Sequence, residues 1–109
     1  MATTYKVLGQ SNPSATTLTA LYTVPSATEA VVSTISVANL SGSAITYRIA
    51  IRPNGAAIDN SHYLAYDVSL AANSTTAYTL GLTLDATDVI SVYASDTNAV
   101  FQAFGSEIA

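Results

Sequence analysis

The sequence has no cysteine and no tryptophan, and charged residues make up only 9% of its 109 positions. Without cysteine, neither a disulfide nor a thiolate metal site can hold the fold together. An ordinary globular domain has about a quarter of its residues charged. So weakly charged a chain indicates a protein whose surface is covered by neighbours in a larger assembly.

Positive charge is especially scarce, because Lys6, Arg48 and Arg52 are the only basic residues and the net charge is −4. Nucleic-acid-binding proteins neutralise phosphates with clustered Lys and Arg. The sequence therefore predicts no nucleic-acid partner.

Long apolar runs are also absent. No stretch approaches the roughly 18 to 20 apolar residues that a membrane helix needs. The segment Met1–Lys6 lacks the basic start and apolar run of a signal peptide. We expect no membrane partner, and synthesis in a cytoplasm without an export signal of the chain's own.

What the chain does contain is period-two alternation of apolar and polar residues, with no helical periodicity. In residues 45–52, Ile45, Tyr47, Ile49 and Ile51 alternate with polar or small residues. Turn signals such as Pro25-Ser26 and Pro53-Asn54-Gly55 separate the segments. The expected strands are 4–8, 17–24, 30–38, 45–52, 62–68, 75–84 with a bend at Gly81, 88–95 and 99–108.

About eight short strands with regular turn signals predict an all-β fold, a single antiparallel β-sandwich or jelly roll spanning residues 1–109. The predicted core follows from the inward phase of each strand. It consists of Val31, Ile35, Val37, Ile45, Tyr47, Ile49, Ile51, Leu80, Leu82, Val89, Val92, Phe101 and Phe104.

The sequence predicts no catalytic residue, no bound cofactor and no metal site. His62 is the only histidine and has no recognisable nucleophile or acidic partner, so we interpret it as a surface strand residue. No glycine-rich phosphate loop is present. Asp85 and Asp88 flank a short turn, where they can bind a hard cation or cap the turn, and capping is favoured.

Two further patterns have ordinary explanations. Asn39-Leu40-Ser41 and Asn73-Ser74-Thr75 fit the N-glycosylation sequon, which is a chance match in a chain rich in Ser and Thr. Among the seven tyrosines, Tyr63 and Tyr66 are expected on opposite faces of one strand, with one of them exposed. An exposed tyrosine there can contact carbohydrate or a protein neighbour, and the protein neighbour is favoured.

Two segments carry a resemblance. The first is LYTVP at 21–25 followed by EAVVSTISVAN at 29–39, and the second is LGLTLDATDVISVYA at 80–94 with Phe101 and FGSEI at 104–108. Together they resemble the opening and closing patterns of small β-sandwich structural proteins of tailed bacteriophage particles.

The resemblance implies a non-enzymatic virion protein, most simply a capsid cement or decoration protein that stabilises the shell. Its partner would be the phage major capsid protein or another virion protein, and the resemblance favours a homo-oligomer, a trimer. The resemblance thus places the protein in the virion, after synthesis in the host cytoplasm. We expect interface residues at the N-terminus, which can pair with a neighbour's sheet edge, and at the exposed tyrosines. These residues are Ala2, Thr3, Thr4, Tyr5, Tyr63 and Tyr66.

Three alternatives stay open. A tail, baseplate or fibre-associated module is a second virion role, and a carbohydrate-binding lectin-like module is a different class. A hydrolase built around His62 is the most distant of the three.

Overall fold

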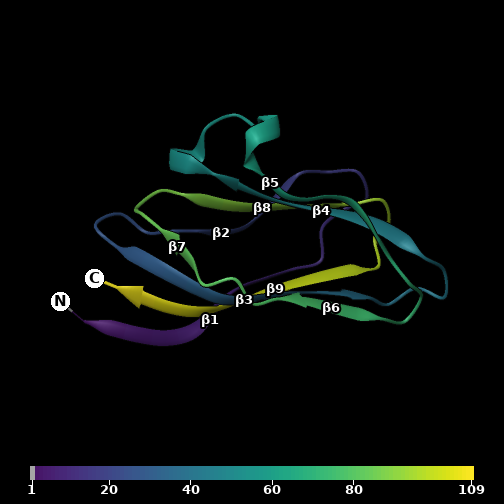
Figure 1. The fold of residues 1–109 in the computed structure, drawn as a ribbon, viewed down its shortest axis with the longest axis horizontal. Helices are drawn as coiled ribbons and strands as arrows, with labels where there is room; N and C mark the ends of the chain where they lie inside the picture. Colours follow the sequence, from purple (N-terminus) through teal and green to yellow (C-terminus); the bar gives the residue numbers. More distant parts are fainter. Residues whose placement is uncertain (1) are drawn as a thin grey trace.

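The computed structural model describes residues 2–109 as two antiparallel β-sheets packed on one another (Figure 1). Sheet A has the strand order β1-β9-β3-β6, with β7 also paired to β3, and sheet B has the order β2-β8-β4-β5. The strands are β1 (Thr3–Ser11), β2 (Thr19–Thr23), β3 (Glu29–Asn39), β4 (Ile45–Arg52), β5 (Tyr63–Leu70), β6 (Thr75–Tyr78), β7 (Leu82–Leu84), β8 (Val89–Ala94) and β9 (Ala99–Ile108). The predicted antiparallel β-sandwich is confirmed, while its assignment as a jelly roll stays a prediction.

An aromatic cluster joins the two sheets in the core. Tyr47 of β4 packs edge-to-face on Phe101 of β9, with ring centroids 6.3 Å apart, and on Tyr78 of β6, 6.4 Å apart. The buried Tyr47 hydroxyl is paired with that of Tyr78, so its burial leaves no unsatisfied polar group. The alternation over 45–52 thus predicts the inward side of β4 correctly.

Most of the predicted core is buried. The correct predictions are Ile35, Val37, Ile45, Tyr47, Ile49, Val89, Val92 and Phe101, and the partly buried Ile51 and Leu82 pack against them. Three predictions are wrong, because Leu80 is 54% exposed and the partly buried Val31 and Phe104 face outward, away from the core.

A β-bulge in β3 explains the error at Val31. The register of β3 against β9 shifts between Val32 and Thr34, which inserts Ser33 as an extra residue. Inward residues have odd numbers after the bulge, as at Ile35, and even numbers before it. Val32 is therefore buried, and Val31 faces outward with Ser106 of β9. A strict period of two continued through Ser33 assigns Val31 to the wrong side.

The expected strand 75–84 is divided into β6 and β7. Thr79, Leu80 and Gly81 lie between them, and Gly81 has the positive φ of +62° that favours glycine. The irregularity predicted at Gly81, a bulge or bend, is a break between two strands, and Leu80 is exposed because it lies in this break rather than in a strand.

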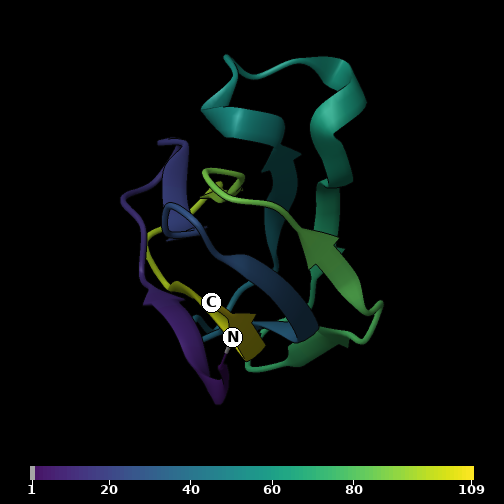
Figure 2. The ribbon, with the colours of Figure 1, turned by 90° about the vertical axis from the view of Figure 1, so that its left-hand side faces the viewer.

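A loop between β4 and β5 projects from sheet B, away from sheet A (Figure 2). It contains two short 3₁₀ turns, η1 (Pro53–Gly55) and η2 (Asn60–His62). His62 therefore closes a turn and does not belong to a strand, contrary to the prediction. In the part of the chain that the structure describes, no helix is long and apolar enough to cross a membrane.

Candidate functional site

The outward side of sheet A is the first candidate surface, and we call it the sheet A face. Residues directly paired across antiparallel strands share a face, so the registers of β1, β3, β6, β7 and β9 define its members. They are Thr3, Tyr5, Val7 and Gln10 of β1; Val100, Gln102, Phe104, Ser106 and Ile108 of β9; Glu29, Val31, Thr34, Ser36 and Ala38 of β3; and Thr75, Ala77 and Thr83 of β6 and β7.

Among these residues Glu29 alone carries a charge, and it lies at the end of β3. An apolar cluster occupies the middle and one side of the face. Tyr5 is 84% exposed and Val7 is 49% exposed, while Val31, Phe104 and Ile108 are partly buried beside them. No described element of the fold packs over this face, since the main contacts of β1 and β9 outside sheet A are with β2 of sheet B.

The predicted N-terminal interface residues belong partly to this face. Thr3 and Tyr5 point outward, whereas Thr4 pairs with Glu107 on the inward side. Ala2 and Ala109 exchange two backbone hydrogen bonds, of 2.6 and 2.9 Å. The segment is thus a paired strand of its own sheet and not a free arm, so strand exchange would first have to separate β1 from β9.

A hydrogen bond and an ion pair on Glu107 link β9 to β2 and β1 where the two sheets meet. The Tyr22 hydroxyl of β2 donates to Oε2 of Glu107 at 2.5 Å, and Lys6 Nζ lies 2.9 Å from Oε1. The Tyr22 hydrogen bond, and then the one from Lys6, lower the pKa of the Glu107 carboxyl below its ordinary value of 4.5. Burial, reinforced by Glu107, raises the pKa of Tyr22, so the phenol stays protonated and keeps donating.

The second candidate surface is an aromatic cluster on the outward side of sheet B. The Arg48 guanidinium carbon lies 4.2 Å from the ring centroid of Tyr66 and 4.3 Å from that of Tyr93. Asp67 fixes this guanidinium through two hydrogen bonds, from Nε at 2.6 Å and from Nη2 at 3.2 Å. The hydrogen bond from Arg48 lowers the pKa of the Asp67 carboxyl.

Tyr63 and Tyr66 lie together, which corrects the prediction that they occupy opposite faces. Their ring centroids are 4.8 Å apart with an interplanar angle of 80°. The register of β5 against β4 shifts twice in this segment, between Tyr47 and Ile49 and again between Ile49 and Ala50. These irregularities break the period of two that placed the two tyrosines apart.

The two tyrosines line a shallow hollow of about 360 Å³ together with Asn60. Tyr66 is 55% exposed, and Asn60 belongs to η2 in the projecting loop. Within η2 the Asp59 carboxylate accepts hydrogen bonds from the Ser61 backbone and hydroxyl, which lower its pKa. His62 Nδ1 accepts the Asp59 backbone N–H at 3.1 Å, so this ring nitrogen closes a capping box.

Asp85 and Asp88 cap their turn. The Asp88 carboxylate accepts from the backbone N–H groups of Asp85 at 2.9 Å and of Asn54 at 2.8 Å, and Asp85 accepts from Ala86 at 2.8 Å. The favoured interpretation of these residues as turn caps is therefore supported. Within residues 2–109, no group of three or more His, Cys, Asp or Glu side chains is arranged to hold a metal ion.

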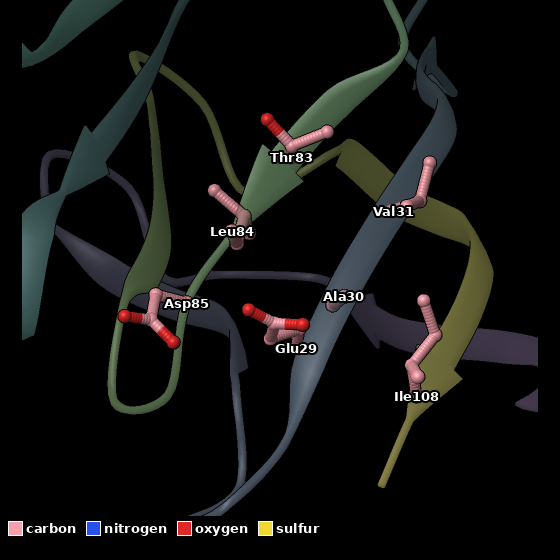
Figure 3. Close-up of a pocket in the computed structure, with 7 residues that line it drawn as sticks. All are labelled: Glu29, Ala30, Val31, Thr83, Leu84, Asp85 and Ile108. Atoms are coloured by element: carbon pink, nitrogen blue, oxygen red, sulfur yellow. The ribbon is translucent and has the colours of Figure 1, made fainter. Parts of the chain in front are cut away.

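A further hollow of about 340 Å³ lies between β7 and β3, at the end of β9 (Figure 3). Glu29 and Asp85 bring carboxylates to it, and Val31 and Ile108 form its apolar side. It borders the sheet A face, and its lining residues include the hydroxyl of Thr83 but no basic side chain.

Sequence reasoning missed Arg48, Asp67 and Tyr93 as parts of the sheet B cluster. Their signal was the outward phase of Arg48 in β4, which places a cation on the open side of the sheet. No protein-family model matches the chain, and no curated protein or solved structure shows significant similarity to it.

Proposed function

We propose that this chain is a non-enzymatic structural protein of a tailed-phage virion, a decoration protein that binds the major capsid protein and stabilises the shell. The resemblance of residues 21–39 and 80–108 to small phage β-sandwich proteins supports the proposal. The structural observation that carries it is the sheet A face, which is nearly free of charge and exposes an apolar cluster around Tyr5 and Val7.

Such a surface suits permanent burial against another protein. Interface centres are depleted in charged residues and enriched in aromatic ones, and Tyr5 and Phe104 provide aromatic area at the sheet A face. Burying apolar area contributes about 25 cal/mol per Å², and no ion has to be desolvated except Glu29 at the margin. A paired sheet is also rigid, which limits the entropy lost on docking.

To stabilise the shell, the protein has to attach to the head of the particle. The phage resemblance favours a trimer as its oligomeric state. Cryo-electron microscopy of the particle separates the head from the tail or baseplate by copy number and position. Native mass spectrometry of the free protein gives the oligomer directly. A strict monomer that is never found on a particle contradicts the proposal.

The experiment that tests the docking face compares binding to shells assembled without this protein. Tyr5→Asp and Val7→Asp each place a charge within the apolar cluster and, because both side chains are exposed, leave the fold intact. We expect each to reduce shell occupancy about tenfold or more. Tyr66→Asp, on the opposite sheet, is the matched control. It should keep full occupancy if the shell interface is the sheet A face and excludes the sheet B tyrosines that the sequence also predicts as interface residues. Equal occupancy for all three variants would refute docking through this face.

A further inference from the structure

We propose that the corner formed by Tyr63, Tyr66 and Asn60 binds a neutral saccharide. This inference goes beyond the proposed virion role and does not depend on it. The two rings meet at 80° and line a hollow of about 360 Å³, so they form two aromatic walls with an amide beside them. Small-ligand sites combine such apolar walls with a few polar groups that orient the ligand.

The walls are held in position before any ligand arrives. Arg48 packs on the Tyr66 ring at 4.2 Å and is itself fixed by Asp67, and Tyr63 packs against Tyr66 at 4.8 Å. Asn60 lies in a turn closed by the reciprocal hydrogen bonds of Asp59 and His62. A preordered site loses little conformational entropy on binding.

The chemistry of the corner selects for a sugar. A pyranose presents an apolar C–H face and a rim of hydroxyls, and a tyrosine presents an apolar ring with a polar tip. A ring face that Arg48 does not cover can accept the C–H face, while the Asn60 amide and the tyrosine hydroxyls are of the type that pairs with sugar hydroxyls. Tyr66 is 55% exposed, so the corner is open to a ligand without rearrangement.

The charged groups near this corner favour a neutral ligand. The Arg48 charge is balanced by Asp67 at 2.6 Å, and Asp59 adds a negative charge in the neighbouring turn. An acidic sugar or a phosphate would therefore meet Arg48 already paired with a carboxylate. It would meet Arg52, the other guanidinium of β4, already donating to Ser91 and to the Gly55 and Ala56 carbonyls. A cationic ligand is disfavoured as well, because Arg48 already occupies the ring face of Tyr66 to which a cation would bind.

The corner lies on sheet B and the projecting loop, on the side of the sandwich opposite the sheet A face (Figures 1 and 2). A chain docked through sheet A would consequently leave this corner open to solvent. Saccharide binding and shell binding are therefore separable in experiment.

The test is titration of the full chain with methyl glycosides of glucose, galactose, mannose and N-acetylglucosamine, followed by ligand-observed NMR. An array of neutral oligosaccharides then extends the panel. We expect saturable binding of at least one neutral sugar, with a Kd of about 1 mM for a monosaccharide. Tyr66→Ala and Asn60→Ala should each weaken it about tenfold, whereas Tyr66→Phe should change it less than about threefold because the ring remains.

Tyr5→Ala is the matched control, because it removes an exposed tyrosine from the other sheet and should leave sugar binding unchanged. Thermal unfolding of each variant confirms that it folds. The proposal is overturned if no neutral sugar binds the wild-type chain, if binding survives Tyr66→Ala and Asn60→Ala, or if glucuronic acid or choline binds better than the neutral sugars. Shell occupancy of Tyr66→Ala should stay full whichever result is obtained.

Discussion

Asn39 connects two loops through one buried side chain. Its Nδ2 donates to the carbonyls of Ser43 at 2.8 Å, Leu70 at 3.2 Å and Ala71 at 3.1 Å. Its Oδ1 accepts from the Ser41 backbone N–H at 2.9 Å. With only 2% of its surface exposed, this amide is inaccessible to a glycan in the folded chain, which supports the interpretation of its sequon as a chance match.

Replacing Asn39 by alanine should destabilise the fold by about 3 kcal/mol, because it leaves buried backbone groups without partners. Urea unfolding of Asn39→Ala against the wild type measures this difference. Asn98→Ala is the control, since the exposed side chain of Asn98 bonds only to Asp96, and we expect a change below about 0.5 kcal/mol. Similar losses for both variants would contradict the role given to Asn39.

Glu107 makes the stability of the folded chain depend on pH. Its pKa is lower in the folded chain than its ordinary value of 4.5, so protons bind the unfolded chain more readily. The stabilisation from Glu107 is therefore complete at pH values above its ordinary pKa and is lost as the pH falls through its lowered pKa. We expect Glu107→Gln to cost about 2 kcal/mol near neutral pH and progressively less in acid.

Urea midpoints of the wild type and Glu107→Gln across a pH series check this prediction. Glu29→Gln, an exposed carboxyl at the start of β3, should change stability little at any pH. If the difference in urea midpoint between wild type and Glu107→Gln stays constant down to acid pH, the contacts of Glu107 with Tyr22 and Lys6 do not stabilise the fold.

At the scale of elements, bulges decide which side chains face the core. The bulge at Ser33 brings β3 so close to β9 that a Cβ on Gly105 would lie 2.0 Å from the Val31 carbonyl oxygen. Only glycine fits there, because the obstacle is backbone and cannot rotate away. The strand pattern predicts β3 and β9 well, but a bulge is set by pairing with a partner strand and leaves no mark in a strand's own periodicity.

Gly105→Ala should therefore destabilise the protein by about 3 kcal/mol through forced separation of β3 and β9. Gly42→Ala is the matched control, because no heavy atom lies within 4 Å of the added Cβ. Its expected effect is within about 0.5 kcal/mol. Thermal and urea unfolding of the pair gives the comparison, and equal effects would show that the close approach at Gly105 does not constrain the fold.

For the whole molecule, the two outward sheet faces have different chemistry, and all the sheet edges are irregular. Register shifts interrupt the edge strands β1 after Val7, β2 after Ala20 and β5 opposite Ile49, and Gly81 separates β6 from β7. Interrupted edges oppose sheet-to-sheet pairing between copies. Assembly through a face is therefore favoured over extension of a sheet.

The sequence predicts the sandwich well but only part of either candidate surface. The sequence predicts Tyr5 as an interface residue of a segment that pairs with a neighbour's sheet edge, and the structure places it on the sheet A face instead. Val31 and Phe104 are predicted in the core, because an apolar residue in a strand is usually inward. The sequence predicts Tyr63 and Tyr66 as contact residues, but their contact with each other depends on irregular pairing of β5 with β4. Arg48 and Asp67 are 19 positions apart, and only the folded sheet brings them together.

Hydroxyl-radical footprinting of the chain, free and bound to its particle, tests most directly whether the sheet A face is the covered surface. Modification of Tyr5 and Phe104 should fall several-fold on binding, while Tyr66 on sheet B should be modified equally in both states. If Tyr66 becomes protected and Tyr5 stays reactive, the chain docks through sheet B and the central claim is wrong.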